Sequence, residues 1–64
     1  MALEQYDRVQ FTTDRFRNEG VLNGAIGYII EKYSDGALEV EISNPQTGIT
    51  VASVVAQANE VRHA

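Results

Sequence analysis

Two glutamates separated by one residue, Glu39 and Glu41, form the pair of side chains in this sequence best suited to acid–base chemistry. They lie in the segment Leu38-Glu39-Val40-Glu41-Ile42, where apolar and acidic residues alternate as they do in a half-buried strand. Residues two apart on a strand share one face, with Cα atoms roughly 6.5–7 Å apart. That separation suits paired-carboxylate hydrolysis, but such an enzyme also needs a cleft that removes one acid from water. A chain of 64 residues has little room for a cleft, so a solvated strand face is the favoured interpretation.

Other catalytic or metal-binding arrangements find even less support. His63 is the single imidazole, and we expect a residue so near the chain end to be frayed, whereas a general base must be held in place. Cysteine is absent, which excludes disulfides and thiolate chemistry and leaves too few ligands for a usual zinc site. The serines have no base partner in the pattern. We therefore expect a non-enzymatic protein with no catalytic residues, no metal and no cofactor.

The charges indicate an acidic surface instead. Nine Asp or Glu residues against five Lys or Arg give a net charge of −4, and residues 25–64 carry −3 of it. Four acids in this part are the candidate contacts for a partner: Glu31, Asp35, Glu39 and Glu41. Complementary charge accelerates the encounter with a cationic protein, so we expect another protein as partner, for example a basic toxin. A nucleic-acid binder would be expected to carry a basic face, which this balance argues against.

One short segment points the other way. Arg15-Phe16-Arg17 joins two cations to an aromatic ring, a combination that can stack on RNA. A nucleic-acid or ribosome-associated domain that uses these three residues is therefore the alternative function. Because Asp14 and Glu19 flank them, a loop partly packed by Phe16 is the favoured interpretation. Exposure of Phe16, Tyr28 or Tyr33 would strengthen a binding role, since aromatic residues and arginine dominate interface energetics.

The elements that must position these side chains are short strands. Five segments have the alternating, β-branched or aromatic composition of strands: residues 7–11, 25–33, 38–42, 49–55 and 61–62. Between them the composition predicts a long loop over 12–24, a hairpin turn at Asp35-Gly36, a turn over 44–48 with Pro45 and Gly48, and a helical or 3-10 turn over 57–60. The alternation over 49–55 is too blurred to assign its inward face.

We expect these strands to enclose one apolar interior. Its predicted members are Val9, Phe11, Ile26, Ile29, Leu38, Val40 and Ile42. The first loop should fold back on this interior through Phe16, Val21 and Leu22. Gly27, inside the second strand, predicts a bulge or a sharp bend.

Five short strands, a long first loop and a late 3-10 turn predict an all-β protein, a small five-stranded SH3-like barrel. A truncated OB-fold shares the strand count but normally needs a longer chain and a helix. Barrel closure should limit exposed strand edges. We expect a single domain over residues 1–64, with its core at about 6–62. So short a chain buries only about 60% of its unfolded surface, which predicts marginal stability or self-association as a homodimer.

Several segments carry a family resemblance. They are Tyr6-Asp7-Arg8-Val9, the run from Leu22 to Glu31, the run from Ala37 to Ile42, Thr50 to Val54, and Asn59-Glu60-Val61. On these residues the chain resembles a group of short bacterial SH3-like barrel domains of uncharacterised function, of the domain of unknown function 4926 type. The resemblance implies a toxin-neutralising or accessory partner, such as an immunity protein or antitoxin, and brings no catalytic residues with it.

Hydropathy gives the last expectation. No apolar run approaches the roughly 18 residues that a membrane span needs, and the amino-terminal residues lack the basic and apolar regions of a secretory signal. We therefore expect a cytoplasmic protein without membrane contact.

Overall fold

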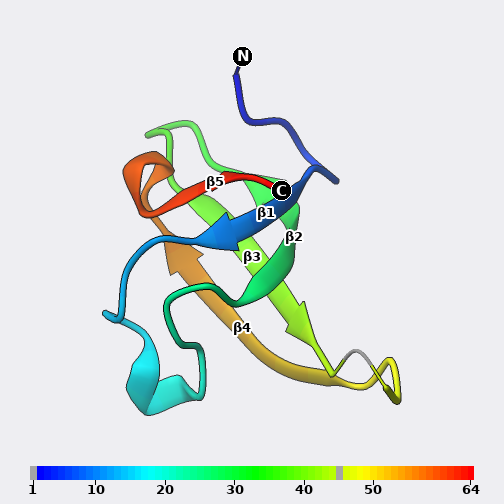
Figure 1. Cartoon of the computed structure of the whole chain (residues 1–64). Helices are drawn as coiled ribbons and strands as arrows, with labels where there is room; N and C mark the ends of the chain where they lie inside the picture. The colour runs from blue at the N-terminus through cyan, green and yellow to red at the C-terminus, as the bar shows by residue number, and fades with distance from the viewer. Residues whose placement is uncertain (1, 45) are drawn as a thin grey trace.

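Five antiparallel strands form one sheet in the order β4-β3-β2-β1-β5 (Figure 1). The structure is a computed structural model and describes residues 2–44 and 46–64. The strands are β1 (Arg8–Phe11), β2 (Ile26–Lys32), β3 (Leu38–Ser43), β4 (Thr50–Ala56) and β5 (Val61–His63). Two short 3-10 helices accompany them, η1 (Arg17–Glu19) in the first loop and η2 (Ala58–Glu60) between β4 and β5. The all-β class, the five strands and the late 3-10 turn are therefore confirmed.

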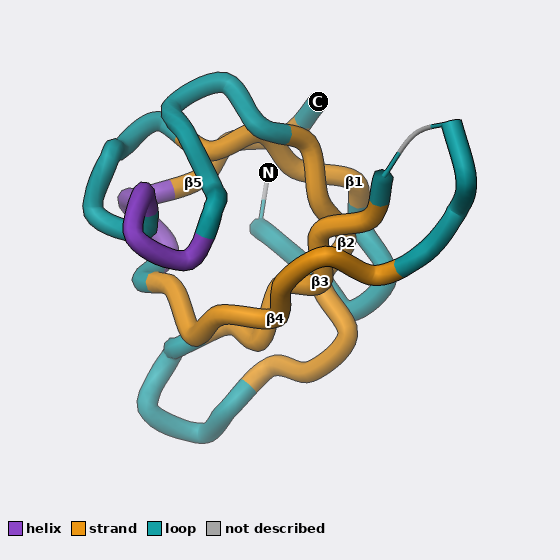
Figure 2. Tube along the Cα trace, turned by 90° about the horizontal axis from the view of Figure 1, so that it is seen from below, coloured by secondary structure: helices purple, strands orange, loops and turns teal. Residues whose placement is uncertain are grey.

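β2 is shared by the two halves of the sheet. Its first residues, Ile26 to Tyr28, pair with β1, and its residues from Tyr28 to Lys32 pair with β3. A bulge between Ile29 and Glu31 interrupts the second ladder, and bulges increase the local twist and bend of a sheet. Figure 2 shows the strands curving around a common interior. This strand order, with a 3-10 turn before the last strand, is the SH3-like arrangement.

The expectation that closure limits exposed edges is wrong. Within residues 2–44 and 46–64, β4 pairs with β3 alone and β5 pairs with β1 alone. β4 and β5 are therefore the two edges of the sheet. Each keeps one row of backbone groups that no neighbouring strand satisfies.

The core matches the predicted interior at six of seven positions. Val9, Phe11, Ile29, Leu38, Val40 and Ile42 are buried, together with Phe16, Val21, Val54, Ala56 and Val61. Ile26 is the exception: it is only half-buried. Successive strand residues point to opposite faces, and because Gly27 and Ile29 point inward, Ile26 points outward. The inward face of β4, left unassigned from the sequence, carries Val54 and Ala56.

Gly27 has a different role from the predicted one. The register shift of β2 lies two to four residues further on, between Ile29 and Glu31. A Cβ atom on Gly27 would lie 2.7 Å from Cγ1 of Val40 and 2.9 Å from the carbonyl oxygen of Glu41. Glycine is required here because β3 crosses too closely to leave room for a side chain.

The first loop folds back on the core as predicted, but through two of the three expected residues. Phe16 and Val21 are buried, and the Phe16 ring meets the Phe11 ring edge-on at a centroid distance of 5.7 Å. Leu22, in contrast, is 55% exposed. The loop also contains η1, which the sequence did not predict, and η1 ends at Gly20 in the left-handed conformation.

The turns form where the composition placed them. In the β2–β3 hairpin, Gly36 adopts a φ of +91° and Asp35 Oδ1 accepts a hydrogen bond from the Ala37 N–H. In the β3–β4 turn, Asn44 Oδ1 accepts from the Gln46 and Thr47 N–H groups; the predicted role of Pro45 lies outside the described residues. Of the helices in the described part of the chain, none has the length and apolar character to span a membrane.

Candidate functional site

The outward side chains of β2, β3 and β4 form the candidate site, called the outer face below. On β3, Leu38, Val40 and Ile42 point into the core, which turns Glu39 and Glu41 outward. The register then sets Glu31 of β2 opposite Glu39, and Tyr28 opposite Glu41. On the other side of β3, Val55 lies opposite Glu39 and Ser53 opposite Glu41. Three of the four predicted acids are thus gathered on one face.

The fourth predicted acid lies elsewhere. Asp35 is in the exposed β2–β3 turn, where its carboxylate is used by the Ala37 N–H at 3.0 Å. Asp35 therefore stabilises the hairpin that aligns Glu31 with Glu39, and it contributes charge only at the rim of the outer face.

Glu39 is held by two hydroxyl groups. Ser53 Oγ donates to Glu39 Oε2 at 2.5 Å, and the Tyr33 hydroxyl donates to Oε1 at 2.8 Å. These bonds, that from Ser53 first, lower the pKa of Glu39 below its ordinary value. The bond to Glu39 in turn raises the pKa of Tyr33. Glu39 is therefore a fixed anion, whereas the general acid of a glycoside hydrolase needs a raised pKa.

Sequence reasoning missed the two donors. In the sequence, the serines lack the base that a nucleophile needs, and Tyr33 is a candidate exposed aromatic; neither pattern indicates a bond to Glu39. Ser53 would be found from the pairing register of β3 with β4. That register depends on the bulge beside Ser43, and the alternation over 49–55 does not reveal it.

Exposed apolar side chains lie among the acids. Tyr28 is 48% exposed, Val55 46% and Tyr33 43%. Large side chains this exposed are usually dispersed on a small domain, but here register places Tyr28 beside Glu41 and Val55 beside Glu39. The outer face therefore mixes carboxylates with aromatic and aliphatic contact area.

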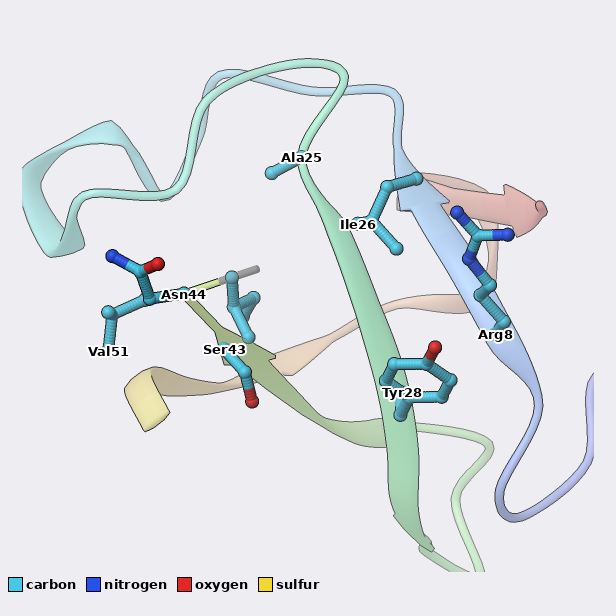
Figure 3. A pocket seen from close by; sticks show the side chains of 8 residues that line it. Arg8, Ala25, Ile26, Tyr28, Ser43, Asn44 and Val51 are labelled. Atoms are coloured by element: carbon cyan, nitrogen blue, oxygen red, sulfur yellow. The ribbon is translucent and has the colours of Figure 1, made fainter. Parts of the chain in front are cut away.

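A half-open groove of about 690 Å³ lies where the outer face meets the β3–β4 turn. It is lined by Arg8, Ala25, Ile26, Tyr28, Ile42, Ser43, Asn44 and Val51 (Figure 3). Figure 3 shows Arg8 and Tyr28 on one side of it, with Asn44 and Val51 across from them. Ile26, expected in the core, is one of its walls. The groove can receive an apolar side chain from a partner that lies on the outer face.

The first-loop segment does not form one binding surface. Arg15 is engaged in a bidentate ion pair with Glu60 and lies over the Phe16 ring at 4.2 Å. The bond from Arg15 is the main cause that lowers the pKa of Glu60. Phe16 is 6% exposed, so its ring cannot stack on a base. Arg15 and Arg17 are both exposed, but within the described residues only Arg17 forms no ion pair.

His63 is better ordered than predicted. It belongs to β5, and its Nε2 lies 2.9 Å from Oδ2 of Asp7. Asp7 also accepts from the Glu4 N–H at 2.9 Å. The bond from Glu4 and then that from His63 lower the pKa of Asp7. The expectation of a frayed His63 is therefore wrong, because pairing of β5 with β1 extends to this residue.

Comparison with known proteins agrees with the resemblance seen in the sequence. The family model described as Domain of unknown function (DUF4926) matches residues 5–63. No curated protein and no solved structure shows significant similarity to the chain. The match covers all five strands and the whole outer face, and the chain therefore belongs to the DUF4926 family.

Proposed function

We propose that this chain is a non-enzymatic protein-binding module that neutralises a basic partner, in the manner of an immunity protein or antitoxin. The observation that supports the proposal most is the composition of the outer face. Its outward strand positions on β2 and β3 carry Glu31, Glu39 and Glu41. Arg8 of β1, opposite Tyr28, is a cation at the border of this face, and Lys32 of β2 lies opposite Leu38 and not on it. Three exposed side chains adjoin these carboxylates: Tyr28 lies opposite Glu41, Val55 lies opposite Glu39, and the Tyr33 hydroxyl donates to Glu39.

Both parts of this surface favour a protein partner. The carboxylates attract a cationic surface and favour one orientation of approach. Tyrosines bury a large area at low entropic cost and are frequent hot spots at interfaces. Glu39 needs little further ordering on binding, since Tyr33 and Ser53 already hold its carboxylate. The partner that fits is thus a protein with Lys or Arg around an apolar contact.

The hydrogen bonds of Glu39 also favour a binding role over acid catalysis. A pair of carboxylates that acts by acid catalysis needs one protonated member. The pKa of Glu39 is shifted the opposite way. Glu39 is therefore suited to recognition as a fixed charge and not to the role of the general acid.

Co-purification of a charge-reversed variant, with a control substitution elsewhere on the surface, tests the proposal. The chain is purified at physiological salt from cells that naturally express it, as wild type, as Glu31→Lys with Glu41→Lys, and as Asn18→Lys. Glu31 and Glu41 are chosen because neither bonds to Tyr33 or Ser53, and Asn18 lies in η1, away from the outer face. We expect one basic protein to accompany the wild type and Asn18→Lys, and to be lost from the double variant.

Two results would overturn the proposal: a wild-type chain that repeatedly returns alone, or a partner that the double variant retains. RNA titration separates the alternative. RNA binding that weakens steeply with salt and depends on Arg17 would replace the protein partner by a nucleic acid.

A further inference from the structure

β4 is an edge strand that lacks two features that normally protect an edge, a short length and charged side chains; the bulge at Val51 lies near its first residues. It has seven residues, and no Asp, Glu, Lys, Arg or His occurs between Glu41 and Glu60. The opposite edge, β5, has three residues and exposes Arg62 and His63. Natural sheets block unwanted pairing by short edge strands and by charged side chains. β5 has both protections, whereas β4 has neither.

The free backbone groups of β4 can be assigned from the ladder with β3. The Asn44 N–H donates to the Ile49 carbonyl at 2.8 Å across the β3–β4 turn. Bonded positions recur at every second residue of an antiparallel ladder. The backbone N–H and C=O groups of the even-numbered residues of β3 therefore point toward β4. Their register partners in β4 are Ala52, Val54 and Ala56. Ser53 and Val55, which alternate with them, therefore direct their N–H and C=O groups toward the open edge.

We infer that β4 pairs in antiparallel fashion with β4 of a second copy of this chain, which makes one continuous sheet of ten strands. The pairing segment is 52–56, because β4 bulges at Val51: Ile42 pairs with Ala52, but its neighbour Ser43 pairs with Thr50. The two-fold axis then passes by Val54, the middle of this segment. It sets Ser53 of each copy opposite Val55 of the other, and both residues have free backbone groups for the ladder.

A second copy fits this edge for three reasons. The edge is uncharged, so pairing it with itself removes no charge from water. Both copies use the same edge, and the protected β5 edges remain outside, so the assembly closes as a dimer instead of growing. The backbones of the nearest acidic strands, the two copies of β3, are separated by three strand spacings, about 14 Å, and the Glu39 carboxylate that reaches over β4 is already bonded by the Ser53 hydroxyl.

This inference goes beyond the proposed function and stands apart from it. Because the two-fold axis is perpendicular to the sheet, both outer faces lie on the same side of the dimer. The dimer would therefore present two acidic surfaces to partners. The Glu31→Lys, Glu41→Lys variant leaves the β4 edge unchanged, so either proposal can fail without the other.

Hydrogen exchange of the wild-type chain tests the edge directly. Amide exchange is followed by NMR in a dilution series, with sedimentation equilibrium at the same concentrations. We expect a mass of two chains at high concentration, and slower exchange of the Ser53 and Val55 amides as the dimer forms. The amides of Ala52, Val54 and Ala56 serve as internal controls, protected at every concentration. A monomer throughout, or a dimer in which Ser53 and Val55 exchange at unchanged rates, would overturn the inference.

A backbone variant gives a second, independent test. Val55→Pro removes an N–H at the open edge, where proline is tolerated, and leaves the ladder with β3 intact. Val55→Thr is the matched control, since it keeps both the N–H and the β-branched side chain. We expect Val55→Pro to sediment as a folded monomer and Val55→Thr as a dimer. Dimerisation of folded Val55→Pro with wild-type affinity would refute the edge pairing.

The register can be tested by disulfide formation, because the chain has no cysteine of its own. Proteins carrying Ser53→Cys and Val55→Cys are mixed and oxidised. We expect the mixed disulfide to form faster than either symmetric one. Faster self-linking of Ser53→Cys would move the axis to Ser53 and overturn the assignment of Val54.

Discussion

Arg15 and Glu60, 45 residues apart in the sequence, form a bidentate ion pair that ties the first loop to η2. Arg15 Nε lies 2.5 Å from Glu60 Oε2, and Nη2 lies 2.7 Å from Oε1. Glu60 Oε1 also accepts from the Gln57 N–H at 2.8 Å, which closes the capping box of η2. One carboxylate thus stabilises both the loop that covers the core and the turn that leads into β5.

Loss of this pair should destabilise the domain, whereas loss of a neighbouring arginine should not. Arg15→Gln removes the bidentate contact and the stacking on Phe16, so we expect a melting temperature lower by on the order of 5 °C. Arg17→Gln removes the same charge from the same loop, but Arg17 has no ion pair among the described residues, and no change is expected. Thermal unfolding followed by circular dichroism compares the two. Equal melting temperatures would show that the pair contributes no stability.

The fold was predictable because strand alternation and turn chemistry agree over most of the chain. Leu38 to Ile42 alternates cleanly, and Asp35-Gly36 gives the preceding hairpin, so β3 and its inward face follow from the sequence. The wrong placement of Ile26 has the same origin as the wrong role of Gly27. An apolar residue beside glycine was assigned inward, but the inward position is that of Gly27, because β3 crosses there without room for a side chain.

The acidic residues of the site could be predicted from the sequence, whereas their hydrogen-bond and ion-pair partners could not. Alternation alone places Glu39 and Glu41 on one outward face. Pairing of Glu39 with Ser53 and of Arg15 with Glu60 depends on residues 14 and 45 positions away in the chain. Such pairs follow from register and from loop closure, which local composition does not determine.

Gly27 should not tolerate even a methyl group. The added Cβ of Gly27→Ala would approach Val40 Cγ1 to 2.7 Å and the Glu41 carbonyl to 2.9 Å. Overpacking of this kind costs about 1–3 kcal/mol of unfolding free energy. Urea unfolding measures it. Val40→Ala in the Gly27→Ala background relieves only the side-chain contact, so the second substitution should add less destabilisation there than in the wild type. Full wild-type stability of Gly27→Ala would contradict the close approach of β3.

Acid should destabilise the domain partly through Glu39. Its pKa in the folded chain is lowered from an ordinary value of 4.5, so the ionised carboxylate stabilises the fold above that pH. This contribution is lost as the pH falls through the lowered pKa. Glu39→Gln should therefore flatten the fall in unfolding free energy between neutral pH and acid. Glu41→Gln, on the same face of β3 but without a hydrogen-bond partner in the described residues, is the control. Parallel curves for wild type and Glu39→Gln would contradict this contribution.

The two hydroxyl donors should have unequal effects on the Glu39 carboxylate. Ser53 is the larger cause of its lowered pKa and Tyr33 the smaller. Ser53→Ala should therefore raise the pKa of Glu39 toward 4.5 by more than Tyr33→Phe does, and both together should bring it closest to that value. NMR titration of the Glu39 side-chain carbonyl carbon reads the pKa directly, with Glu41 as the reference signal on the same strand. A pKa of Glu39 that neither substitution moves would show that the hydroxyls lie near the carboxylate without bonding to its charged form, and the outer face would then lack its fixed anion.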